Sequence, residues 1–202
     1  MSSSLESDFS GAEKRTTPFT VEQRKGHGTF WSANSSALST VLYDAFMADF
    51  NNQDLQNLYY HLEYECLSPK TTIFLLRHKD THNIVGFTSY YPITEDNGHL
   101  YHVFEEKLNL PKILIQPHAA MVGNTAITPE YRHQGGWRML MDALDQDVLR
   151  TESVYMVRTV RTNENYSNIV KQRYLPYILD KSSFWSLGQQ ERLWMDLSPL
   201  LV

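Results

Sequence analysis

The chain has 202 residues, 42% of them hydrophobic and 20% charged, which predicts a single globular domain. A net charge of -5 argues against a broad nucleic-acid-binding surface, because such surfaces gather lysine and arginine. No run of about 18 apolar residues occurs, so no membrane association is expected. The only cysteine, Cys66, cannot form an internal disulfide, which predicts a reducing compartment, the cytoplasm.

The first 16 residues are rich in serine and mixed charge and hold few apolar side chains, so they are predicted to be disordered. Residues 17–202 are predicted to form the one domain. In its first part, apolar residues at helical spacing follow Ser35, and β-branched residues flank the polar turn 79–83. The elements predicted there are a strand and turn at 18–31, helices at 35–50 and 54–67, and a hairpin of strands at 71–77 and 84–93.

The second part alternates strands and helices. Leu140, Leu144 and Val148 recur at helical spacing and predict a buried stripe, with the neighbouring aspartates mostly facing elsewhere. That helix joins two strands, so a right-handed parallel crossover is expected. Residues 94–112 fit a strand, a short helix or a substrate-facing loop. The elements predicted are strands at 119–127 and 154–160, helices at 136–150 and 165–174, and a closing hairpin of strands at 177–187 and 191–197.

The junction between the strand at 119–127 and the next helix indicates an anion site. Pro129 ends the apolar strand, and the adjacent Gly135 and Gly136 open the helix. The first N–H groups of a helix have no intrahelical partner, and the helix dipole adds partial positive charge at the same place. Phosphate is the anion that such a turn most commonly binds.

These residues resemble the acetyl-CoA signature of the GNAT superfamily of acyl-CoA-dependent N-acyltransferases. In that signature an apolar residue, a proline and often Tyr-Arg lead into Q/R-x-x-G-x-G/A. Ile127, Pro129 and Tyr131-Arg132 match the first part, and Arg132-His133-Gln134-Gly135 match the start of the loop. Trp137 departs from the pattern, since it stands where the family has Gly or Ala. Downstream, Asn165 matches the asparagine of a second family motif, Asn-x-x-Ala, which is otherwise poorly kept.

The resemblance implies an α/β (α+β) fold: a mixed, splayed sheet of about seven strands with helices on both faces. It implies an acetyltransferase that binds acetyl-CoA or another acyl-CoA and acylates a primary amine. Backbone N–H groups of residues 133–137 would bind the CoA pyrophosphate, and the strand ending at Ile127 would pair with the pantetheine arm. The cofactor-binding residues so implied are Ile127, Arg132, His133, Gln134, Gly135, Gly136, Trp137 and Asn165.

The catalytic residues are less well indicated. The family's usual tyrosine position holds Gln172, and Tyr174 is the catalytic candidate nearby, with packing in the core as its alternative role. Cys66 has no evident histidine partner, which favours direct transfer in a ternary complex over a covalent intermediate. His78 and His82 lack a complete ligand set, so no metal is expected. The candidates for a general base, among which nothing selects, are Glu95, Asp96, His102, Glu105, Glu106 and His118.

Two other functions are weighed. Trp137 and Gln172 are compatible with a CoA-binding regulatory or interaction module without turnover. The other alternative is an enzyme of this fold that acts on aminoacyl-tRNA. The acidic composition counts against the latter and favours a cationic amine acceptor. The identity of the acceptor, the acyl chain length and the oligomeric state, a homodimer included, are left open by the sequence.

Overall fold

The computed structural model describes residues 17–93, 119–151, 155–161, 165–186, 188–197 and 199. Residues 1–16, predicted to be disordered, and residues 94–112, for which the sequence allowed three structures, lie outside the described residues. Within the described ranges, no helix is both long enough and apolar enough to cross a membrane.

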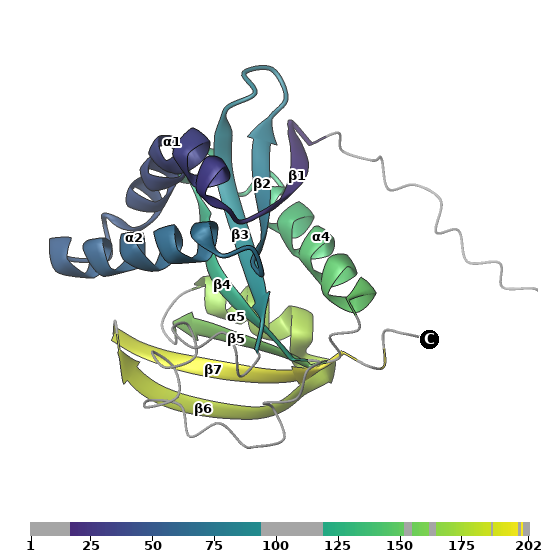
Figure 1. Cartoon of the computed structure of the whole chain (residues 1–202). Coiled ribbons are helices and arrows are strands. Elements are labelled where there is room, and N and C mark those ends of the chain that lie inside the picture. Colours follow the sequence, from purple (N-terminus) through teal and green to yellow (C-terminus); the bar gives the residue numbers. More distant parts are fainter. Residues whose placement is uncertain are drawn as a thin grey trace, which may run out of the picture.

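The described residues contain seven strands, which form one mixed sheet. They are β1 (Phe19–Lys25), β2 (Thr72–His78), β3 (Ile84–Pro92), β4 (Ala119–Ile127), β5 (Tyr155–Arg161), β6 (Ile178–Ser186) and β7 (Gly188–Asp196). Their order across the sheet is β1-β2-β3-β4-β5-β7-β6, and only the β4–β5 pair is parallel. In Figure 1, β5, β7 and β6 run across the direction of β2 and β3. The parallel pair is the one predicted from the β-α-β order.

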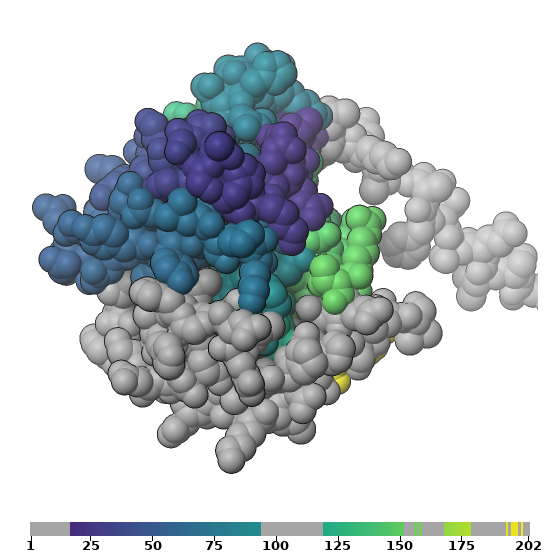
Figure 2. Space-filling model, in the orientation of Figure 1, coloured from purple at the N-terminus to yellow at the C-terminus, as the bar shows by residue number. Residues whose placement is uncertain are grey.

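Helices cover both faces of this sheet, and the α+β class implied by the sequence is confirmed. The helices are α1 (Gly28–Phe46), α2 (Asn52–Leu67), α4 (Gly136–Arg150) and α5 (Asn165–Tyr174), with short 3-10 helices η3 (Pro129–Tyr131) and η4 (Leu175–Tyr177). Figures 1 and 2 show α1 and α2 on one side of β2 and β3 and α4 on the other. A core lies on each side because each face of the sheet presents apolar side chains to its helices.

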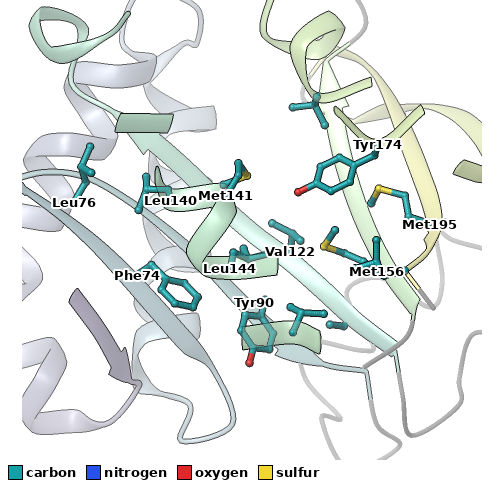
Figure 3. Packing of buried hydrophobic residues seen from close by; sticks show 14 of the residues in the cluster. Phe74, Leu76, Tyr90, Val122, Leu140, Met141, Leu144, Met156, Tyr174 and Met195 are labelled. Atoms are coloured by element: carbon teal, nitrogen blue, oxygen red, sulfur yellow. The ribbon is translucent and has the colours of Figure 1, made fainter. Parts of the chain in front are cut away.

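The two cores use different residues of the same strands. On the α1 and α2 side, Leu42 and Leu62 pack with Phe87 of β3. The cluster on the α4 and α5 side is the larger one and includes Leu140 of α4 and Tyr174 of α5. Figure 3 shows both residues among the apolar side chains of this cluster, with Met141 between them. The alternation of side chains along each strand explains how one strand supplies both cores.

Most predicted elements are found, but several boundaries are wrong, among them the end of α1, which lies at Phe46 instead of residue 50. α1 begins at Gly28 instead of residue 35, because the His27 ring accepts the Phe30 N–H at 3.1 Å and caps the helix early. Phe30 is therefore a buried helical residue and not part of a strand and turn. The predicted turn at 188–190 is shorter, since Gly188 already pairs with Ser186 in the hairpin of β6 and β7.

Candidate active site

Strands β4 and β5 pair only where both begin. Residues 119–121 of β4 pair with residues 155–157 of β5, and the strands then separate although they continue to Ile127 and Arg161. β4 stays paired with β3 as far as Ile127. The backbone of β4 therefore borders a V-shaped opening toward β5, which we call the β4–β5 opening. Beyond Met121, no strand among the described residues pairs with this edge of β4, and backbone groups at a strand edge can bond an extended ligand.

β4 carries a bulge where this opening begins. Gly123 and Asn124 together stand opposite the single residue Ser89 of β3. A Cβ at position 123 would lie 2.4 Å from Ser89 Oγ and 2.6 Å from Glu65 Oε2, so any other residue would have to displace these two side chains. Bulges redirect backbone groups and are over-represented beside active sites. The bulge residues are only half-buried, in contrast to the buried first half of β4.

The turn between β4 and α4 is fixed to the body of the protein by Tyr131 and Arg132. The Tyr131 ring packs edge-on against Phe19, with ring centroids 6.2 Å apart. Arg132 Nε donates to the Ile127 carbonyl at 3.1 Å, and Nη2 donates to the Ala45 carbonyl in the last turn of α1 at 2.8 Å. These two motif residues therefore position the turn. Because a guanidinium has five donors and Arg132 is exposed, further N–H groups remain for an anion.

The turn itself has an unusual backbone. His133 (φ 62°) and Gly135 (φ 85°) both adopt the left-handed conformation, which is uncommon for a residue with a Cβ. The Gln134 side chain donates to the Glu130 carbonyl at 3.0 Å, which ties the turn back on itself. All three residues are exposed. Turns that alternate conformations in this way direct successive N–H groups to one side and form concavities that bind anions.

α4 starts at Gly136, packed tightly on the sheet. A Cβ there would lie 2.5 Å from Leu76 Cδ2, so the glycine lets the first turn of the helix approach β2 closely. The first N–H groups of α4 point away from the rest of the helix and carry its positive dipole end. Arg138 in the same turn has a side chain that is 82% exposed, which adds a cation at the surface beside the turn. This end of α4 has the geometry and charge that a phosphate requires.

Trp137 does not crowd the loop. Its side chain packs against the core on the α4 and α5 side, and the guanidinium carbon of Arg173 lies 6.0 Å from its ring centroid. The indole therefore contacts α5, whereas the loop contributes its backbone. Only the backbone N–H of residue 137 is needed for the predicted contact with pyrophosphate, so the departure from Gly or Ala at this position is compatible with the site.

Tyr174 and Asn165 mark the two ends of α5. Asn165 is its first residue, directly after the short link from β5. Tyr174, at the last position, is buried, and its hydroxyl donates to Asp145 Oδ1 at 2.7 Å. Figure 3 shows the ring directed from α5 toward Met141 of α4. Burial, together with the Asp145 charge, raises the pKa of the Tyr174 hydroxyl, so that it stays protonated at neutral pH.

An ion-pair cluster joins α4 to α5 beside that hydroxyl. Arg173 donates from Nη2 to Asp145 Oδ2 at 2.6 Å and to Asp142 Oδ1 at 2.8 Å. Burial raises the pKa of Asp145 even though Arg173 and Tyr174 stabilise its charged form. Asp145 thus departs from the expectation that the aspartates of this helix face away from the core. Helical spacing shows which face a residue occupies, but not that α5 brings an arginine to it.

Arg158 of β5 was not predicted as a site residue. It is 2% exposed, and its guanidinium reaches back across the β4–β5 opening, where Nη2 donates to Thr125 Oγ1 of β4 at 3.1 Å. Thr125 Oγ1 in turn lies 2.7 Å from Thr88 Oγ1. The available signal was the alternation in β5, which puts Arg158 on the inward side with Met156. A buried cation therefore borders the opening on the side of α4.

Glu65 of α2 was also not predicted as a site residue. Its carboxylate lies behind the β4 bulge, where Oε2 accepts from Ser89 Oγ at 2.6 Å and from the Asn124 N–H at 3.4 Å. Oε1 accepts from Asn124 Nδ2 at 3.3 Å. Burial raises the pKa of Glu65 to about 7, despite these three hydrogen bonds. Its position three residues after the buried Leu62 was the signal that could have placed it inward.

The candidates for a general base drawn from residues 95–118 lie outside the described residues. In the part of the chain that the structure describes, no three His, Cys, Asp or Glu side chains come together as a metal site would require. Cys66 is buried, and its burial raises the pKa of the thiol. A buried neutral thiol is a poor nucleophile.

The family model described as "Acetyltransferase (GNAT) family" matches residues 39–169, well over half of the chain. The chain belongs to this acetyltransferase family. The matched range contains the β4–β5 opening, the bulge and the turn into α4, so the family assignment and the geometry concern the same part of the molecule. The family acts with acetyl-CoA. No curated protein matches the sequence significantly.

Solved structures share this fold at low sequence identity. The ribosomal-protein-S18-alanine N-acetyltransferase of Escherichia coli is 13% identical with a TM-score of 0.53, over 88% of this chain and 93% of that one. Ard1 of Thermoplasma volcanium is 12% identical with a TM-score of 0.54, over 89% and 98%. PaiA N-acetyltransferase of Thermoplasma acidophilum, solved with coenzyme A, is 10% identical with a TM-score of 0.52, over 86% and 98%. These similarities concern the fold.

Proposed function

We propose that this GNAT family enzyme transfers an acetyl group from acetyl-CoA to a primary amine by direct attack in a ternary complex. The observation that carries the proposal is the coincidence, at one end of the sheet, of the β4–β5 opening and the N-terminus of α4. The opening offers an unpaired strand edge to the amide groups of pantetheine, and the helix end offers N–H groups and positive charge to the pyrophosphate. One extended acetyl-CoA molecule would contact both the strand edge and the helix end.

The proposed donor site assigns a role to each part of the turn. Backbone N–H groups of residues 133–137 bind the pyrophosphate, and the glycine at 135 permits the loop conformation that exposes them. Arg132 positions the turn and offers its remaining donors to phosphate oxygens, while the backbone of Ile127 and the rest of β4 bonds the pantetheine arm. Asn165 is proposed to contact that arm from the start of α5.

Titration of the purified protein with acetyl-CoA by calorimetry tests the donor site. We expect binding, and we expect acetyl-pantetheine, which lacks the pyrophosphate, to bind at least tenfold more weakly because the contacts at the start of α4 are lost. Equal affinity for the two thioesters would contradict the proposed pyrophosphate site. Absence of acetyl-CoA binding at high-micromolar concentration would contradict the function as a whole.

Thiol release with a panel of amines then tests turnover. The panel should contain an alanyl peptide, free lysine, spermidine and phosphinothricin, which differ in size and charge but each present a primary amine. Sustained release that depends on the amine is expected for the enzyme. A protein that binds acetyl-CoA and releases thiol with none of these amines, at a rate no faster than hydrolysis, would favour the alternative of a CoA-binding module without turnover.

Tyr174 is proposed to give a proton to the leaving CoA thiolate. The support for this role is the Tyr174 hydroxyl, which is protonated at neutral pH and lies on the α4 side of the sheet. It is close enough to Arg158 for the charge of the guanidinium to affect the pKa of the hydroxyl. Replacing Tyr174 with phenylalanine is expected to lower kcat about 10²-fold, the usual size of a general-acid contribution, while the Kd for acetyl-CoA stays within about threefold. A variant that loses thermal stability but keeps kcat would assign the tyrosine to packing against Asp145.

A further inference from the structure

The two sides of the β4–β5 opening carry opposite charges. On the α4 side stand Arg158 and the N-terminus of α4, and both favour an anion. On the α2 side the carboxylate of Glu65 lies against the bulge. CoA is strongly anionic, whereas a primary amine is a cation at neutral pH. The charges therefore separate the approach of the donor from that of the acceptor.

Among the residues that the structure describes, Glu65 has no partner of opposite charge. Its neighbours are a hydroxyl, an amide side chain and a backbone N–H, and no lysine or arginine among the described residues forms an ion pair with it. A buried carboxylate without a cation is costly and is uncommon unless a function retains it. A protonated amine at the bulge would supply the missing charge.

The carboxylate also keeps a position for one more donor. A carboxylate has about four acceptor positions, two on each oxygen. Oε2 uses both of its positions for Ser89 and the Asn124 N–H, whereas Oε1 accepts only Asn124 Nδ2 from the described residues. The bulge residues beside Glu65 are half-buried. An amine N–H, or one bridging water, can therefore donate a hydrogen bond from the opening to the second acceptor position of Oε1.

Resting on the function proposed above, we propose that Glu65 is the base of the acetyl transfer and receives the amine on the α2 side of the β4–β5 opening. The ammonium group passes one proton to Glu65 Oε1. The neutral nitrogen attacks the thioester carbonyl carbon, the C–N bond forms and the C–S bond breaks. The thiolate takes the hydroxyl proton of Tyr174. The second proton that the nitrogen loses then reprotonates the Tyr174 oxygen. The products are the amide, the thiol and protonated Glu65, which returns its proton to solvent.

The titration of Glu65 suits this task. Burial raises its pKa to about 7, near the pH at which a base is most effective. The titratable groups placed around it are the Cys66 thiol next to it on α2, His61 one turn earlier, and Tyr91 two residues after Ser89 on β3. The Cys66 thiol stays neutral because its pKa is raised by burial and by the Glu65 charge. The kcat/KM of the enzyme should therefore rise with pH around neutrality as Glu65 loses its proton.

Three variants test the proposal, using acetyl-CoA and the amine of the panel that releases thiol fastest. Glu65→Gln keeps the shape and is expected to lower kcat at least about 10²-fold and to remove the acid limb of the pH profile. Ser89→Ala removes a hydrogen bond that lowers the pKa of Glu65. Its acid limb should move to higher pH, an effect that a merely structural carboxyl would not produce. Glu63→Gln is the matched control, because that carboxylate on α2 accepts from Trp31 Nε1, away from the bulge.

Calorimetry separates failure of this assignment from failure of the proposed function. Wild-type protein and Glu65→Gln should bind acetyl-CoA with Kd values within about threefold, since Glu65 lies on the acceptor side. Wild-type protein that does not bind acetyl-CoA contradicts the proposed function. If Glu65→Gln turns over within about threefold of wild type, or if it keeps the acid limb, Glu65 is not the base.

Discussion

Replacing Arg173 with methionine is expected to destabilise the protein by about 2–3 kcal/mol, less than the removal of one partner of a fully buried ion pair, because the side chains of Arg173 and Asp145 are 23% and 13% exposed. Methionine fills the space of the arginine stem but leaves the Asp145 carboxylate, which is 13% exposed, without its cation. Urea denaturation measures the loss. The change should also loosen the start of α4, because Arg173 packs over Trp137 in that first turn.

The same variant has a predictable pH dependence. Without Arg173, burial raises the pKa of Asp145 further above its unfolded value, so the native state holds the proton more tightly than the unfolded state. The contribution of Asp145 to the stability of the variant should therefore be greatest below its unfolded pKa and should be lost as pH rises through its native pKa. The loss relative to wild type is expected to be larger on the alkaline side of neutrality than below the unfolded pKa of an aspartate.

Arg138→Met is the matched control for Arg173→Met. Arg138 lies 3.9 Å from Asp142, the carboxylate that Arg173 also contacts, but the Arg138 side chain is 82% exposed. An exposed pair of this kind contributes at most about 1 kcal/mol. If the two variants lose similar stability, burial does not determine the contribution of the Arg173 ion pairs to the free energy of unfolding. The conclusion that these pairs hold α5 on α4 is then wrong.

Gly135→Ala is expected to weaken acetyl-CoA binding about tenfold or more. At φ 85° a Cβ costs about 1–2 kcal/mol, and here it would also lie 3.2 Å from Thr17 Cγ2. The loop can avoid this cost by changing conformation, but the N–H groups at the start of α4 then no longer converge on one anion. Since about 1.4 kcal/mol is a tenfold change, calorimetry resolves the effect readily.

Two other glycines serve as controls for Gly135→Ala. At Gly136 the added Cβ would meet Leu76 of the core, so Gly136→Ala should cost about 1–3 kcal/mol of folding stability through overpacking. At Gly28 nothing lies within 4 Å of the added Cβ, and neither affinity nor stability should fall. An unchanged Kd for acetyl-CoA in Gly135→Ala would show that the loop does not bind the pyrophosphate.

The turn between β4 and α4, which is the proposed donor site, could be predicted from the sequence because its determinants are local. The signature from Ile127 to Gly136 lies within one turn, and the structure shows a strand end, two left-handed residues and a helix start in that order. The buried stripe Leu140, Leu144 and Val148 followed from helical spacing for the same reason. Local pattern is sufficient where one element and its cap fix the geometry.

The acceptor end depends on contacts between distant parts of the chain. Glu65 meets Asn124, 59 residues later, and Arg158 meets Thr125, 33 residues earlier. The sequence could indicate that each side chain faces inward, but not which element would face it. Asp145 and Arg173 likewise become partners only when α5 packs on α4.

What the sequence by itself determined is therefore the order of strands and helices and the glycine-containing turn at the start of α4, where we propose that phosphate binds. Both follow from spacing, caps and turn residues within short stretches. Only the tertiary structure decided where β4 leaves β5, that Glu65 lies behind the bulge, and that the two sides of the opening differ in charge. The physical reason is that burial and electrostatic partners are properties of the packed sheet and helices, and they change a pKa such as that of Glu65 only after folding.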